Sequence, residues 1–241
     1  MIRSLAVALT AGVLSAGACS SSTVTVDVFA ASSLTDAFAQ IEERFEAANP
    51  GVDIRLNLAG SDTLRRQIDD GADADVFAPA ALDVFDGLQV TPIPYAANQL
   101  EIVVNTDPGL VDRVIAGDVE GLLIARCAPG VPCGMAADRL VADLDLDLSG
   151  ATITSEASVR AVLSKVQLGE ADVGFVYRTD TVAADGEVVS VGLTSDDARV
   201  VLALAALTNG GSETSKTAEA FVTFAVSQDD VFAALGFEPA P

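Results

Sequence analysis

The chain has 241 residues, enough for one large domain or two smaller ones, and half of them are apolar, which excludes a disordered protein. Its formal charge of −22, from 35 acidic and 13 basic residues, excludes charge-driven binding to nucleic acid or to an anionic membrane. The sequence contains no histidine, which removes the usual general base, the Ser-His-Asp and Cys-His catalytic groups, and most zinc and iron sites.

The first residues have the pattern of an export signal. Arg3 gives a small positive charge, residues 5–14 are apolar, and residues 15–19 are small and end in a cysteine. A cysteine at this point, followed by three serines, resembles a bacterial lipoprotein signal. We therefore expect a signal peptide over residues 1–18, and a lipidated Cys19 with a flexible linker over residues 19–23. This would hold the exported protein at the outer face of the cytoplasmic membrane; simple secretion is the alternative.

A strand, a serine-rich turn and a long helix open the mature chain. Residues 23–29 are typical of a buried strand. The apolar residues that follow recur at helical spacing, at Leu34, Ala37, Phe38, Ile41 and Phe45. Ser33 stands where an N-cap residue belongs, and Asp36 three residues later matches a capping box. The pattern therefore predicts that Ser33 caps this helix.

The same arrangement recurs in the next segment. Residues 52–58 alternate like a strand, and the turn at Ser61 leads into a short helix over residues 64–68. The following elements are predicted to be a buried strand over 75–78, a brief helix over 81–88, an extended connector over 91–95 and a strand over 100–105.

The second half of the chain contains two more strand-to-helix turns. The predicted elements are helices over 110–116, 134–144, 160–168 and 214–226, a last short helix before Gly236, and strands over 122–126, 152–154, 172–177, 187–191 and 200–206. The acidic residues 143–147 indicate a solvated helix end rather than a calcium loop, because Leu148 stands where an EF-hand needs glycine. Cys127 and Cys133 favour a disulfide in an exported protein, and two free thiols are the alternative.

Strands that alternate with helices predict an α/β fold with largely parallel sheets. The chain is predicted to cross from one lobe to the other at the strand over 100–105 and to return at the strand over 200–206. This gives two lobes, the first made of residues 24–97 and 204–241 and the second of residues 98–203. Ligands of such sheets bind at the carboxyl ends of the strands, beside helix N-termini. The ligand is therefore expected in the cleft between the lobes.

Four helix starts can meet in this cleft. Ser33 and Ser61 come from one lobe, and the regions of Cys133 and Val159 come from the other. Helix N-termini carry free N–H groups and favour anions, and the phenol of Tyr177 adds a further donor. Because such a site needs no Arg or Lys, it suits a fully ionised ligand that only accepts hydrogen bonds.

These residues resemble a known family, the molybdate-binding proteins of ABC importers, within the type II periplasmic-binding-protein superfamily. The resemblance covers about residues 24–238. It rests on the order and spacing of Phe29-Ala30-Ala31-Ser32-Ser33-Leu34-Thr35, Ser61-Asp62-Thr63-Leu64-Arg65-Arg66-Gln67-Ile68 with Gly71, Ala74-Asp75-Val76-Phe77, Val131-Pro132-Cys133-Gly134, Ser158-Val159-Arg160 and Gly174-Phe175-Val176-Tyr177.

The resemblance implies a non-enzymatic receptor that hands its ligand to an ABC permease. It implies a molybdate or tungstate oxyanion, not a bare metal cation or a cofactor, held by Ser33, Ser61, backbone N–H groups at Cys133 and Val159, and the hydroxyl of Tyr177. Cys133 stands where the family usually has Ala or Ser, which a backbone donor tolerates. Asp62 beside Ser61 is expected to point away from the anion. We expect a monomer.

Two other readings remain open from the sequence. The first is a receptor for a different oxyanion, such as sulfate, phosphate or an organic anion. The second is a hydrolase with Ser32 or Ser33 as nucleophile. This hydrolase would lack a histidine base, and no lysine occurs three residues after a serine, as a Ser-x-x-Lys enzyme needs.

Overall fold

The structure, a computed structural model, describes residues 23–207 and 211–241. The predicted signal peptide and Cys19 lie outside the described residues. Within the described part, no helix has the length and apolar character that crossing a membrane requires.

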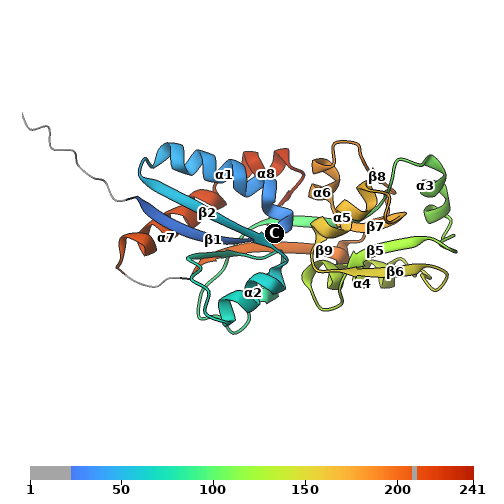
Figure 1. The fold of residues 1–241 in the computed structure, drawn as a ribbon, viewed down its shortest axis with the longest axis horizontal. Helices are drawn as coiled ribbons and strands as arrows, with labels where there is room; N and C mark the ends of the chain where they lie inside the picture. Colours follow the sequence, from blue (N-terminus) through green and yellow to red (C-terminus); the bar gives the residue numbers. More distant parts are fainter. Residues whose placement is uncertain (1–22, 208–210) are drawn as a thin grey trace, which may run out of the picture.

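Two α/β lobes lie side by side along the long axis of the molecule (Figure 1). The first contains β1 (Val24–Ala31), β2 (Val52–Ala59) and β3 (Val76–Ala78), with α1 (Thr35–Ala48), α2 (Ser61–Asp69), α7 (Glu213–Val226), α8 (Asp229–Ala234) and the 3-10 turns η1 (Ser32–Leu34) and η2 (Leu82–Phe85). The second contains β5 (Leu123–Cys127), β6 (Thr152–Glu156) and β7 (Val173–Tyr177), with α3 (Pro108–Ile115), α4 (Pro132–Asp143), α5 (Val159–Gln167) and α6 (Arg178–Ala183).

Two long strands, β4 (Ile93–Val104) and β9 (Arg199–Ala206), join the lobes. The strand order is β2-β1-β3-β9-β4-β7-β5-β6. The first half of β4 pairs with β9, and its second half pairs with β7 of the second lobe. Short strands β8 (Val189–Ser190) and β10 (Glu238–Pro239) also pair with β4, so the chain ends against the strand that connects the lobes.

The sheet is mixed rather than largely parallel. The outer strands of each lobe pair in parallel, β1 with β2 and β3, and β5 with β6 and β7. The antiparallel pairs all involve β4 or β9, because these strands carry the chain across and back. The strands that precede the predicted helix starts are therefore parallel, and their carboxyl ends meet at the boundary between the lobes.

Apolar side chains on β1 and α1 form the core of the first lobe. Val26, Val28, Leu34, Phe38 and Ile41 are all fully buried. Phe38 and Phe45 of α1 pack against Phe221 of α7, with ring centroids 6.3 and 5.2 Å apart. The helical spacing that predicted α1 is thus the spacing of its buried face.

Candidate anion-binding site

One small cavity between the lobes brings together all of the predicted oxyanion-binding positions. Ser33, Ser61, Cys133, Val159 and Tyr177 line it, together with neighbouring residues of the same turns. Each of the five is less than 8% exposed. These five residues are therefore shielded from solvent, and both lobes contribute to the wall of the cavity.

Ser33 lies in η1, between the end of β1 and the start of α1. The N-cap of α1 is Leu34, with no side-chain capping bond, so the prediction that Ser33 caps this helix is wrong. The Ser33 hydroxyl is buried and has no partner among the described residues. Asp36 does not complete a capping box, because its carboxylate contacts Arg160 of the other lobe. The hydroxyl of Ser33 is thus left free to donate into the cavity.

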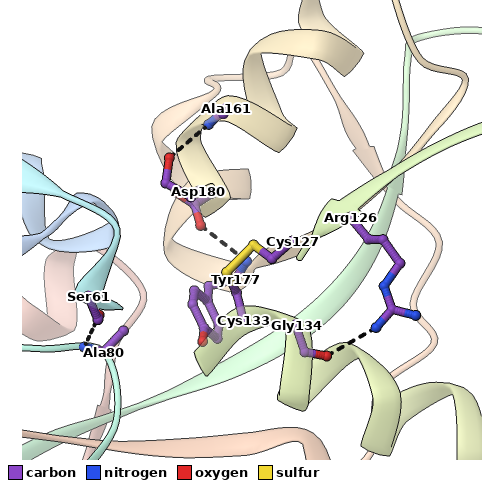
Figure 2. Close-up of a disulfide and its surroundings, with 10 residues drawn as sticks. Ser61, Ala80, Arg126, Cys127, Cys133, Gly134, Ala161, Tyr177 and Asp180 are labelled. Carbon is purple, nitrogen blue, oxygen red and sulfur yellow. Dashed lines mark hydrogen bonds between the residues drawn. A yellow bond between two sulfur atoms is a disulfide. The ribbon is translucent and has the colours of Figure 1, made fainter. Parts of the chain in front are cut away.

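Ser61 is the first residue of α2, after the strand β2. Figure 2 shows the hydrogen bond that its hydroxyl accepts from the N–H of Ala80, and the N···O distance is 3.0 Å. Because the oxygen already accepts from a backbone donor, its own proton is available for a ligand. Asp62, the next residue, does not line the cavity. Burial is the main cause that raises the pKa of Asp62, while Arg66 lowers it and Asp83 raises it.

Cys133 lies in the first turn of α4, directly after Pro132 at the first helical position. In the structure a disulfide joins it to Cys127, the predicted partner, and ties this turn to the end of β5 (Figure 2). Gly134 packs so closely on this segment that a side chain there would overlap the carbonyl oxygen of Ala128. Helix geometry leaves the N–H of Cys133 without an intrahelical partner, so it is available to the cavity.

Val159 begins α5, and the N-cap Ser158 accepts from Ala161 N at 3.3 Å. The Ser158 side chain thus satisfies one of the free N–H groups of this helix. The N–H of Val159 has no intrahelical partner in the first turn. Only the backbone of Val159 is needed at the cavity, which explains how an apolar residue can contribute to an anion site.

Tyr177 ends β7, and its side chain is 1% exposed, with a hydroxyl that has no partner among the described residues. Its N–H donates to the carboxylate of Asp180 at 3.1 Å, and this bond stabilises the start of α6, whose N-cap is Tyr177. Burial, with a smaller effect of Asp180, raises the pKa of the Tyr177 hydroxyl above its usual value of 10.0. The phenol therefore stays protonated and can serve as a donor.

The cavity is lined by neutral donors. Its lining contains no Asp, Glu, Lys or Arg, so neither a cation nor a carboxylate faces the ligand. Its volume is about 20 Å³. Pockets for drug-sized ligands measure about 300 Å³ or more. The site can therefore accept a group the size of a small inorganic anion, and it excludes larger organic ligands in this closed form.

One contact between the lobes beside this cavity was not predicted from the sequence. Gly60 of the first lobe lies against Ala157 of the second, and a side chain on Gly60 would overlap the carbonyl oxygen of Ala157. The only sequence signal is the glycine itself, directly before Ser61. This close approach of two backbones shows that the structure has the lobes in contact around the cavity.

A larger cavity of about 200 Å³ lies within the second lobe, lined by apolar residues such as Val119 and Phe175. Asp145 and Asp147 are its only ionisable residues, so it does not suit an anion. No group of three or more His, Cys, Asp or Glu side chains within residues 23–207 and 211–241 is placed to hold a metal ion.

Known proteins share this fold and much of this sequence. A family model for bacterial extracellular solute-binding proteins matches residues 26–238. The molybdate-binding protein ModA of Mycobacterium tuberculosis strain H37Rv is 37% identical over 171 residues, which are 68% of this chain and 65% of that protein. The putative ABC transporter substrate-binding lipoprotein YvgL of Bacillus subtilis is 33% identical over 193 residues, covering 73% of this chain and 74% of that protein.

A solved structure of a similarly named protein has a similar fold. The substrate-binding domain of a putative molybdenum ABC transporter from Clostridium difficile is 27% identical, with a TM-score of 0.66, and the match covers 90% of this chain and 99% of that chain. The predicted two-lobed α/β fold and the predicted resemblance to molybdate-binding proteins are confirmed. This chain spans slightly less than two thirds of the length of the M. tuberculosis relative.

The family match covers both lobes and the whole wall of the cavity. Its members are solute-binding proteins, which confirms the prediction that this chain is not an enzyme and sets the serine hydrolase aside. The chain belongs to the family of bacterial extracellular solute-binding proteins.

Proposed function

We propose that this protein captures molybdate or tungstate outside the cytoplasm and delivers it to an ABC permease. The observation that carries the proposal is the convergence of hydroxyl and N–H donors, without any charged side chain, on a cavity of about 20 Å³. The names of the M. tuberculosis and C. difficile proteins support the choice of oxyanion.

The donors suit an anion that has no proton left. Among the described residues the hydroxyls of Ser33 and Tyr177 have no partner, and the Ser61 oxygen already accepts from the Ala80 N–H. Hydrogen bonds to a charged partner contribute about 1.5–3 kcal/mol each, so five such bonds supply on the order of 10 kcal/mol before the costs of closure and desolvation. A partly protonated ligand such as phosphate would present a hydrogen-bond donor to a wall that has no carboxylate to accept it. Molybdate is larger than sulfate and fills a slightly wider ring of fixed donors. We propose that the size of the cavity selects molybdate over sulfate in this way.

Isothermal titration with molybdate, tungstate, sulfate and phosphate tests this proposal. We expect one molybdate or tungstate per chain and no heat with phosphate. Tyr177→Phe should lower the affinity about 10- to 100-fold, because it removes one hydrogen bond to a charged ligand. Tyr95→Phe is the matched control, since Tyr95 also has a buried hydroxyl with no partner in the described part of the chain, but packs on Phe232 and does not line the cavity. Binding of sulfate alone, or equal losses in both variants, would contradict the proposal.

The anchor, the assembly state and the lobe boundaries belong to the same proposal. We propose that Cys19 carries a lipid, which fits the name of the B. subtilis relative. Mass spectrometry of protein extracted from membranes, compared with a Cys19→Ala variant, tests this. We also propose that the protein is a monomer, which light scattering tests. We propose one lobe of residues 24–97 with 204–241 and another of residues 98–203, and limited proteolysis tests these boundaries.

A further inference from the structure

An ionic contact crosses the cleft directly beside the cavity. Arg160, the second residue of α5, lies between two carboxylates. One belongs to Asp36 in α1 of the first lobe, and the other belongs to Asp180 in α6, 2.9 Å from the Arg160 Nε. Arg160 and Asp36 are partly exposed, with side chains 27% and 45% accessible, whereas Asp180 is fully buried. We call these three residues the interlobe clasp.

Each member of the interlobe clasp is next to a residue of the candidate site. Asp36 lies one helical turn after Ser33, and Arg160 directly follows Val159. Asp180 accepts from the N–H of Tyr177. The clasp therefore connects the segments that bring donors from both lobes, although none of its side chains lines the cavity.

The two contacts of Arg160 differ in what happens when the lobes separate. Asp180 in α6 and Arg160 in α5 both belong to the second lobe, so their contact is kept when the lobes separate. Asp36 is in the other lobe, so opening must break its contact with Arg160. The buried carboxylate of Asp180 lies within ion-pair distance of the guanidinium, although its Oδ1 and the Arg160 Nε form no hydrogen bond among the described residues. This attraction restricts the guanidinium and reduces the entropy lost when Asp36 meets it.

We propose that Arg160 is a positioning residue, and that its contact with Asp36 holds the lobes closed over the anion and slows its release. This rests on the proposed function, since molybdate is the probe. Because Arg160 does not line the cavity, removing Asp36 should act through closure of the lobes and raise the dissociation rate of the anion. A partly exposed ion pair predicts a two- to fivefold effect.

The test compares Asp36→Asn with Asp230→Asn. Asp230 pairs with Arg44 at 2.8 Å, but both lie in the first lobe, and Asp230 is also in the first turn of a helix. Stopped-flow tyrosine fluorescence can follow molybdate release, because Tyr177 lines the cavity and the chain has no tryptophan. We expect about two- to fivefold faster release in Asp36→Asn only, and a smaller difference from wild type in 1 M NaCl, which screens the pair.

Equal release rates in Asp36→Asn and wild type, or the same increase in Asp230→Asn, would overturn the clasp. Small-angle X-ray scattering gives a readout that does not depend on the ligand, because a clasp predicts a larger radius of gyration for empty Asp36→Asn than for empty wild type. If wild type binds no molybdate but this difference is present, the proposed function fails and the clasp stands. If wild type binds molybdate but neither measurement separates the variants, only the clasp fails.

Discussion

The disulfide between Cys127 and Cys133 should contribute to both stability and anion binding. We consider replacing both cysteines by alanine, which removes the bridge without leaving a free thiol. The ring that it closes has a sequence separation of 6, and chain entropy assigns a loop of this size about 2 kcal/mol. For a protein of this length, that loss lowers the midpoint of thermal unfolding by about 4–8 °C.

The effect on binding follows from the position of the bridge. Cys133 is in the first turn of α4, and the bridge holds this turn against the buried end of β5. If the turn becomes mobile, its N–H is no longer held at the cavity. The loss of affinity is then at most the worth of one hydrogen bond to a charged partner, about 1.5–3 kcal/mol.

Calorimetric melting and isothermal titration with molybdate measure the two effects. A reducing agent should lower the stability and affinity of wild type, and it should not change the double-alanine variant, which serves as its control. An oxidised wild type and a double-alanine variant with the same melting temperature and the same affinity would refute this reasoning.

Three further predictions concern closure, pH and packing. Gly60→Ala should lower molybdate affinity about 5- to 150-fold, because overpacking costs about 1–3 kcal/mol and does so only in the closed form. The control Gly211→Ala should leave the affinity unchanged, since there is open space around Gly211. Equal affinities of the two variants in titration would contradict this prediction. Burial raises the pKa of Asp180 to about 6, although Arg160 lowers it and Asp36 raises it, so the folded state holds this proton more tightly than the unfolded chain. The stability of wild type relative to Asp180→Asn should therefore fall as pH rises from about 4 to 6, and urea unfolding that shows the opposite slope would contradict it. Val119→Ile should fill part of the 200 Å³ cavity and raise the free energy of unfolding by about 0.5–2 kcal/mol without changing molybdate affinity, which urea unfolding and titration check together.

Most of the fold could be predicted because its elements have clear periodicity. The strand at residues 172–177 and the helix at residues 160–168 differ from β7 and α5 by one residue at their starts. The helix α6 was missed because it has six residues and little apolar periodicity, and the bond between Tyr177 N and Asp180 secures its start. The connector at residues 91–95 proved to include the start of β4, where an irregular register after Pro94 allows a proline within the strand.

The candidate site was predictable where it depends on local turns. Every predicted binding position lies at or just after the end of a strand that the sequence predicts: Ser33, Ser61, Cys133, Val159 and Tyr177. Their convergence could be predicted because parallel strands end at the same edge of a sheet. The role of Ser33 as a cap was wrong because a local pattern cannot show that Asp36 meets Arg160, 124 residues away. The contact between Gly60 and Ala157 depends in the same way on how the lobes close.

The neutral wall of the cavity has a consequence for the speed of capture. The whole chain has a formal charge of −22, and no cation in the cavity wall offsets it. Diffusing anions are therefore repelled before they reach the cleft, and added salt should speed their association by screening this repulsion. Tight binding in such a protein has to come from a long residence time, which the closed lobes and their fixed dipoles can supply.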